Sequence, residues 1–304
     1  MEKPGLLVAT FPTDVFLLVP DGATLYAMTV DGAMFSVDKN SGNVQNLQPP
    51  GRLASSVAVG PEQVFELVVD GTLQALPKSG GPLSTVISGE VTSYGLQFDG
   101  KRLWWVAGNP LAVRTLDPGA TAARTVAFAV VRLLAADSSE AFWIDDQETL
   151  FRSIDGGAPT SVKAGVATAT LALSGDWLWL GRGDTLNRIP RSGGPVEMFE
   201  RLKDGIIRLV ATSDSVAFST YQEVYPPPLQ ASECEPGKNG GLPFPAFFRD
   251  TAGREESHHY EVYTMPAAGG GPILSGSGTD IGPLAQVGRV VYWGEANRLL
   301  RSQP

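Results

Sequence analysis

The chain alternates short apolar runs with turns that are rich in Gly, Pro and Asp. Seven apolar runs, most of them with aromatic residues, recur in similar surroundings and begin at residues 25, 64, 103, 141, 177, 216 and 290. Successive runs start 36 to 39 residues apart, except for a last gap of 74. A fixed period with one doubled gap indicates seven copies of one structural unit, one of which carries an insertion.

Each repeat predicts four short strands. An apolar run such as FLLV at residue 16 precedes the aromatic run, and a third run such as LQAL at residue 73 follows it. The turn between the second and third strands is often Asp-Gly, as at Asp31-Gly32 and Asp70-Gly71. Asp-Gly between apolar strands is a strong hairpin signal, because both residues tolerate positive φ. A Gly-rich turn then leads to the fourth strand.

Four-stranded repeats of roughly 40 residues are typical of β-propeller blades. We therefore predict an all-β, seven-bladed β-propeller, with a six-bladed ring as the alternative. The last repeat stops after its third strand, and a spare apolar run, GLLVAT at residue 5, precedes the first repeat. We expect this run to complete the seventh blade and close the ring, which removes an exposed sheet edge. Residues 1–304 then form one domain, with a loop at 222–259 inserted in the sixth blade.

The composition and charge of the chain exclude several classes of partner and binding site. The formal net charge of −9 argues against a nucleic-acid partner, because an acidic surface repels phosphate. The sequence contains no run of 18 apolar residues, so we predict no transmembrane segment. Cys234 is the only cysteine and the two histidines are adjacent, which excludes an intramolecular disulfide and a three-histidine zinc site. The start of the chain does not resemble a signal peptide, although an exported chain without its leader would look the same. We expect a monomer, with a weak indication of a periplasmic or extracellular location.

Several blade sequences resemble a known class. Phe142-Trp143-Ile144-Asp145 and Tyr292-Trp293-Gly294-Glu295 resemble the YWTD-type propellers, and residues 186–195, LNRIPRSGGP, resemble bacterial repeat proteins with a Gly-Gly-Pro turn in each blade. The resemblance implies a bacterial propeller of the broad YWTD/NHL-like class. That class includes receptor ectodomains, scaffold proteins and several enzymes, so it implies a fold rather than a function. The receptors of the class have six blades, whereas this chain has seven repeats.

The insertion is the first candidate for a binding surface, because a long connection in a compact domain is usually functional or disordered. The resemblance implies that the connection between second and third strands emerges near the mouth of the central channel. Aromatic residues in the insertion favour a cap or a pocket wall. The predicted ligand- or partner-binding residues are Phe244, Phe247, Phe248, Arg249, Tyr221 and Tyr225.

Ionisable residues suggest a catalytic alternative. His258 or His259 could act as a general base, with Glu255 or Glu256 as a metal ligand. Neighbouring side chains of an extended strand point to opposite sides, so at most one of the two histidines could face the channel. Cys234 has acidic neighbours and no local histidine, and we interpret it as incidental.

Acidic residues at the turns between second and third strands suggest a hard-cation site. Ca²⁺ takes six to eight oxygen ligands, so a ring of carboxylates could hold it. The simpler interpretation is that Asp is favoured at such turns. We expect no cofactor, with Ca²⁺ or Mg²⁺ as the alternative. The residues of this set are Asp31, Asp70, Asp145, Asp146, Asp184, Glu223 and Glu295, of which Asp145 and Asp184 are the candidate metal ligands.

Three functions follow. We expect a non-catalytic propeller that binds a protein or a small molecule at the channel mouth. The first alternative is a lyase or hydrolase that depends on a divalent cation; seven-bladed bacterial lyases with a histidine and magnesium resemble this chain only in blade number. The second alternative is a sugar-binding lectin with exposed tryptophans between the blades, although we expect most of the six tryptophans to pack there.

Overall fold

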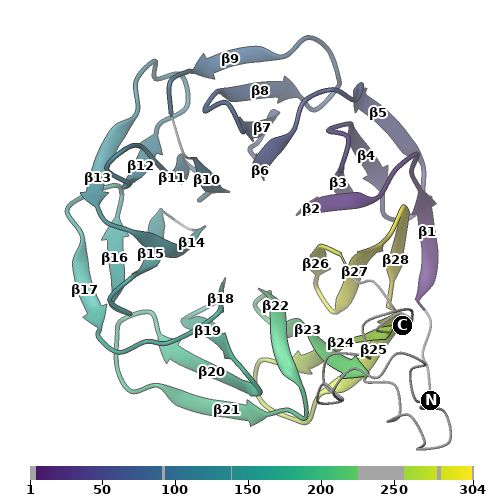
Figure 1. The fold of residues 1–304 in the computed structure, drawn as a ribbon, viewed down its shortest axis with the longest axis vertical. Helices are drawn as coiled ribbons and strands as arrows, with labels where there is room; N and C mark the ends of the chain where they lie inside the picture. The colour runs from purple at the N-terminus through teal and green to yellow at the C-terminus, as the bar shows by residue number, and fades with distance from the viewer. Residues whose placement is uncertain (1–4, 91–92, 138, 225–256, 279–281, 303–304) are drawn as a thin grey trace, which may run out of the picture.

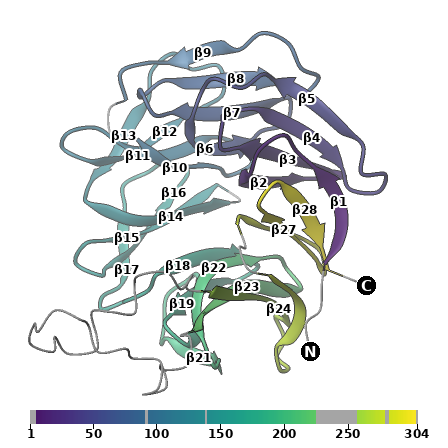
Figure 2. The same cartoon turned by 45° about the vertical axis from the view of Figure 1, so that its right-hand side comes forward.

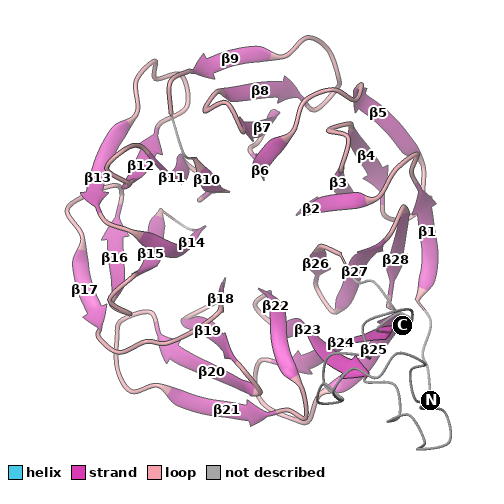
Figure 3. Ribbon diagram, viewed as in Figure 1, coloured by secondary structure: helices cyan, strands magenta, loops and turns pink. Residues whose placement is uncertain are grey.

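The fold is an all-β ring of seven four-stranded antiparallel sheets (Figure 1), as the computed structural model of the chain shows. The structure describes residues 5–90, 93–137, 139–224, 257–278 and 282–302, without the side chains of residues 222–224, 257 and 258. Within these residues there are strands and loops but no helix (Figure 3). The predicted seven-bladed β-propeller is therefore confirmed, and the six-bladed alternative is wrong.

Each blade uses four strands in the order in which they occur along the chain, from the centre outward, except that blade 7 takes its outer strand from the N-terminus. Blades 1 to 3 consist of β2 (Val15–Asp21), β3 (Thr24–Thr29), β4 (Met34–Asp38) and β5 (Val44–Gln48); β6 (Ala54–Val59), β7 (Gln63–Val68), β8 (Leu73–Pro77) and β9 (Ser84–Ile87); and β10 (Tyr94–Phe98), β11 (Leu103–Ala107), β12 (Ala112–Leu116) and β13 (Arg124–Phe128). Blades 4 to 6 consist of β14 (Val131–Asp137), β15 (Glu140–Asp145), β16 (Leu150–Ile154) and β17 (Thr160–Lys163); β18 (Thr170–Ser174), β19 (Trp177–Arg182), β20 (Thr185–Pro190) and β21 (Glu197–Arg201); and β22 (Gly205–Ala211), β23 (Ser215–Val224), β24 (Ser257–Pro266) and β25 (Ile273–Gly278).

Blade 7 closes the ring. It consists of β26 (Leu284–Val287), β27 (Val290–Glu295) and β28 (Arg298–Arg301), with β1 (Leu6–Thr10) as its outer strand. Leu7 lies opposite Leu300 and Thr10 lies opposite Arg298, so the first strand of the chain pairs with the last. The prediction that the N-terminal run completes the seventh blade is confirmed.

The core lies between the blades. The second strand of each blade is buried on both faces, because each face packs against a neighbouring blade. Trp104, Trp105, Trp143, Trp179 and Trp293 are fully buried there, whereas Trp177 is only partly buried. The oblique view shows the blades as separate sheets stacked around the ring (Figure 2). Five of the six tryptophans therefore stabilise contacts between blades, and in the part of the chain that the structure describes the tryptophans do not form repeated exposed pockets.

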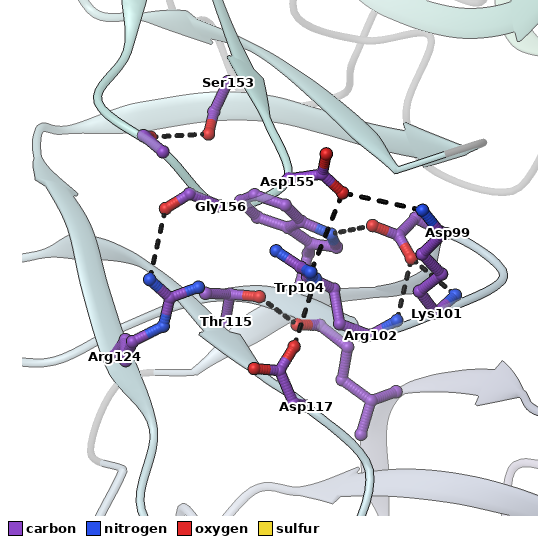
Figure 4. A network of polar contacts seen from close by, with 12 residues as sticks. Asp99, Lys101, Arg102, Trp104, Thr115, Asp117, Arg124, Ser153, Asp155 and Gly156 are labelled. Atoms are coloured by element: carbon purple, nitrogen blue, oxygen red, sulfur yellow. Dashed lines mark hydrogen bonds and ion pairs between the residues drawn. The ribbon is translucent and has the colours of Figure 1, made fainter.

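Polar contacts also join the blades. Asp99, on the turn between β10 and β11, accepts hydrogen bonds from Trp104 Nε1 at 2.7 Å and from the backbone N–H groups of Lys101 at 2.7 Å and Arg102 at 2.8 Å (Figure 4). Arg102 extends from this turn towards Asp117 of its own blade and Asp155 of blade 4. A single short turn of blade 3 thus holds its own tryptophan and contacts the next blade.

No helix in the described residues is long and apolar enough to cross a membrane.

Candidate functional site

One face of the ring carries both the turns between second and third strands and the connections from blade to blade. We call it the turn face. Backbone hydrogen bonds join the two kinds of segment: Val30 N donates to Asp14 O at 2.9 Å, and Val69 N donates to Leu53 O at 3.2 Å. The same relationship joins Asp146 N to Val130 O in blade 4 at 2.9 Å. In the described residues the turns and connections therefore lie side by side around the mouth of the channel, and we call them the rim.

The rim exposes aliphatic side chains over blades 1 and 2. Val30, Leu53 and Val69 are 48%, 53% and 68% exposed, and we call these three residues the aliphatic ridge. Gly32 connects them: a Cβ atom built on it would lie 1.6 Å from Arg52 O, so the blade 1 turn rests directly on the connection that carries Leu53. Only glycine permits so close an approach, and its φ of 84° also favours glycine. The three aliphatic residues therefore follow one another along the rim.

Other exposed apolar residues lie around the same face. Phe16 and Ile207 occupy β-bulges at the turn-face ends of the innermost strands β2 and β22, and Val130 lies on the connection between blades 3 and 4. Scattered surface aliphatics need no explanation, but a group around one opening is typical of an interaction surface. The sequence pattern did not single out these residues.

The channel behind the mouth has a volume of about 460 Å³. Its walls are the seven innermost strands, and its polar side chains, Gln97, Asp137 and Gln286, come from the ends of their strands far from the turn face. Each innermost strand pairs with only one neighbour, so its free backbone N–H and C=O groups face the channel. The channel therefore offers backbone hydrogen-bonding groups in addition to these three polar side chains.

The chain enters and leaves the predicted binding insertion on the turn face. β23 and β24 continue for three residue pairs beyond Tyr221 and Tyr260, about 10 Å at 3.3 Å per residue. The two tyrosines lie opposite each other, with ring centroids 5.3 Å apart. The predicted residues Tyr225, Phe244, Phe247, Phe248, Arg249, Glu255 and Glu256, together with Cys234, lie outside the described residues, as do the side chains of Glu223 and His258.

His259 lies at the base of this hairpin. Its Nε2 atom is 3.7 Å from Glu261 Oε1, and both side chains are partly exposed. Glu261 also accepts a hydrogen bond from the hydroxyl of Tyr263, and burial, followed by this bond, raises the pKa of Tyr263. His259 is thus close to one carboxylate that is already engaged by a tyrosine. A catalytic role for His258 or His259 stays a prediction.

The predicted acidic ring is spread over separate turns. Asp145 Oδ1 accepts hydrogen bonds from the backbone N–H groups of Gln147 at 3.0 Å and Thr149 at 2.8 Å. Asp31 accepts one from the Thr29 hydroxyl at 2.6 Å, and this bond lowers the pKa of Asp31. Asp184 lies 3.9 Å from Arg201. Among the described residues, no three His, Cys, Asp or Glu residues lie close enough together to hold a metal ion.

Comparisons with known proteins give the fold. No family model matches the chain, and no curated protein matches it. Its structure is similar to that of the computationally designed Ika8 protein, with a TM-score of 0.62, 12% identity, and 99% of this chain and 100% of that chain covered. It is similar to YCF48 bound to D1 peptide, with a TM-score of 0.63, 11% identity and coverage of 97% and 94%.

A third likeness is to the β-propeller domain of Cps50 (Swd1) from Myceliophteria thermophila. The TM-score is 0.65 and the identity 11%, with 96% of this chain and 98% of that chain covered. At these identities the likenesses show the fold alone. The resemblance to YWTD/NHL-like propellers stays a prediction, whereas the seven-bladed β-propeller is established.

Proposed function

We propose that this protein is a non-catalytic binding propeller whose turn face engages a peptide segment of a partner protein. The observation that carries the proposal is the aliphatic ridge. Val30, Leu53 and Val69 are adjacent along one rim and exposed, at turn and connection positions where polar residues are the norm. Burying such side chains against a partner is favourable in proportion to the apolar area removed from water.

Charged side chains border the aliphatic ridge and could bind polar groups of the same peptide. Asp14 and Asp70 are exposed on the same rim, and Arg52 lies between Gly51 and Leu53. A polar border around an apolar centre is the usual composition of a transient interface. A similar propeller, YCF48, is known in a complex with the D1 peptide, which supports peptide binding as a use of this architecture. The insertion between β23 and β24, with Phe244, Phe247 and Phe248, belongs to the same proposed face.

The test is selection of binding peptides from a random display library on the immobilised protein. We expect peptides with apolar side chains, and we expect Leu53→Asp and Val69→Asp to weaken their measured affinity at least tenfold. Two exposed apolar residues away from the turn face supply matched controls: Ile154→Asp at the end of β16, and Met198→Asp on the outer strand β21. Both controls should bind like the unmodified protein.

The proposal is wrong if selected peptides keep their affinity for the ridge variants or lose it on the control variants. A second arm replaces residues 222–259 by Asp-Gly, the pair found at residues 31–32 and 70–71 in the turns of blades 1 and 2. Loss of binding in this variant alone would transfer the site from the ridge to the insertion.

A further inference from the structure

One position of the blade repeat holds a buried glutamate. In all seven blades the fourth strand has a β-bulge where it pairs with the third. The bulge lies between two consecutive residues of the third strand, and the second-strand residue that pairs with the second of them is buried between blades. Register identifies these equivalent residues as Ala27, Glu66, Trp105, Trp143, Leu180, Phe218 and Trp293. Glu66 is the one ionisable residue of this set, and it is 0% exposed.

Two buried glutamines surround Glu66. Gln74 lies directly opposite it on β8, and Gln48 comes from β5 of blade 1. Each glutamine is 5% exposed. Gln48 Nε2 donates to Gly32 O at 3.4 Å, which links the group to the turn that carries Val30. We call Gln48, Glu66 and Gln74 the blade 1–2 polar cluster.

The cluster has more acceptors than donors. Four buried oxygens, namely Gln48 Oε1, both carboxylate oxygens of Glu66 and Gln74 Oε1, accept no hydrogen bond from the described residues. The Gln48 amide acts on the Glu66 carboxyl as a neighbouring dipole, but the geometry of a hydrogen bond is not met. An ionised carboxylate buried without donors is strongly unfavourable. One proton on Glu66 turns an acceptor into a donor, which could then satisfy an oxygen of a neighbouring glutamine.

We propose that the blade 1–2 polar cluster is a proton-binding site that holds Glu66 neutral in mildly acidic solution and weakens the contact between blades 1 and 2 when the proton leaves. Nothing in this proposal depends on the proposed peptide-binding function.

The few charged groups near the blade 1–2 polar cluster favour binding of a proton to Glu66. Burial raises the pKa of Glu66 to about 7, against smaller opposing effects of Gln48 and of Arg52, on the connection between β5 and β6. The side chains packed between these blades include Met28, Met34, Leu47, Val57, Val64 and Leu76, none of which is ionisable. Tyr26 belongs to the same core, but it lies beside Asp21 at the opposite end of the blade.

A metal cation fits less well. Glu66 is the single carboxylate of the cluster, whereas a calcium site takes six to eight oxygens, several of them from carboxylates. Arg52 places a positive charge nearby, which repels a cation. The proton needs neither a second carboxylate nor a full coordination shell.

The direction of the pH effect follows from the raised pKa. The folded state binds the proton more tightly than the unfolded state, so the stabilisation is complete below about pH 4.5 and is lost as pH rises through about 7. Over this range the folding equilibrium constant falls by up to about tenfold per pH unit. Glu66→Gln keeps the shape and cannot titrate, so it should remove this part of the pH dependence.

The experiment compares denaturant unfolding of the unmodified protein, Glu66→Gln and Glu62→Gln at pH 5 to 8.5. Glu62 lies on an exposed turn of the same blade, and its substitution changes the net charge equally. We expect Glu66→Gln to gain at least tenfold in folding equilibrium constant, relative to the unmodified protein, between pH 5 and pH 8. Glu62→Gln should show no such gain. An infrared carboxylic-acid band near pH 6 that disappears in Glu66→Gln reports the proton directly.

Two results would overturn the proposal. Parallel pH profiles of the unmodified protein and Glu66→Gln, without the infrared band, would mean that Glu66 is ionised and hydrated. Stabilisation of the unmodified protein at pH 8 by Na⁺, K⁺ or Ca²⁺ at constant ionic strength, absent in Glu66→Gln, would make the site a cation site. If Glu66→Gln does not fold, Glu66→Leu, the residue that blade 5 uses, provides the same comparison.

Discussion

Arg191 of blade 5 donates hydrogen bonds from both terminal nitrogens of its guanidinium group to the carboxylate of Asp137 of blade 4, and the Nη2–Oδ2 distance is 2.5 Å. Arg191 follows the third strand of its blade, and Asp137 ends the first strand of the preceding blade. Lys78 and Asp21 repeat this arrangement between blades 2 and 1, at 2.5 Å. Between blades 4 and 3 the polarity is reversed, with Asp155 facing Lys101 and Arg102. The face opposite the turn face is thus joined by ion pairs between neighbouring blades.

The bidentate pair should contribute measurably to stability. We expect a double-mutant cycle with Asp137→Asn and Arg191→Met to give a coupling of about 1–2 kcal/mol by denaturant unfolding, since the pair is charge-assisted and Arg191 is mostly buried. Burial lowers the pKa of Arg191, but the hydrogen bonds and charge of Asp137, with the charge of Glu140, outweigh it and raise the pKa overall, so the coupling should persist to high pH. Lys101 and Asp155, 3.7 Å apart and well exposed, supply the control pair and should show no measurable coupling. Equal couplings for the two pairs would contradict the expectation.

The contact between Gly32 and Arg52 predicts a severe effect of one methyl group. Gly32→Ala must move the backbone of the connection to Leu53, and we expect a loss of at least about 2 kcal/mol in the free energy of unfolding. Gly22→Ala tests conformational strain alone, because Gly22 also has a positive φ but no atom lies within 4 Å of the position that its added methyl group would take. We expect it to cost about 1 kcal/mol. Similar losses for both variants would mean that the close approach contributes nothing.

The turn at Asp99 offers a test of a buried charge. Asp99→Ala leaves three donors without an acceptor, among them the indole N–H of the fully buried Trp104. We expect a loss of about 2–4 kcal/mol in the free energy of unfolding. Trp104→Phe removes one donor and part of the packing, and in that background Asp99→Ala should cost less. Additive losses in the double variant would argue against the direct bond.

The number and order of the blades could be predicted because each second strand is buried on both faces and leaves a continuous apolar run. The exposed ridge could not be predicted for the same reason. Val30 and Val69 extend the apolar runs that start at Leu25 and Val64, so the pattern places them inside strands. The strands end at Thr29 and Val68, and the pattern is wrong by one residue at each.

Glu66 was missed because of register. Its neighbours in the sequence are apolar, and a lone acidic residue in a strand usually faces water. Its equivalence to Trp105 and Trp143 depends on where the fourth strand bulges against the third, and the apolar pattern does not show the position of a bulge. Local sequence does not contain that information.

We predict that removal of β1, the outer strand of blade 7, destabilises the closed ring. Without residues 1–10, β28 becomes a sheet edge, and we expect a lower unfolding temperature and concentration-dependent association by light scattering. A synthetic peptide of residues 4–12 should restore the monomeric scattering mass by occupying the vacated edge. A scrambled peptide is the control. An unchanged scattering mass after the truncation would contradict the role of β1 in closure.

The pairing of β1 with β28 also sets an order of events during synthesis. Residues 6–10 are made before the other strands of the ring, yet their partners, residues 298–301, are made after blades 1 to 6. The six other blades each form from strands that follow one another in the chain, with residues 225–256 between β23 and β24 of blade 6, whereas blade 7 needs strands from before and after all of them. Contacts between such distant segments form slowly. The first strand of the ring therefore stays unpaired longest, and it is the segment that a chaperone would have to shield until the ring closes.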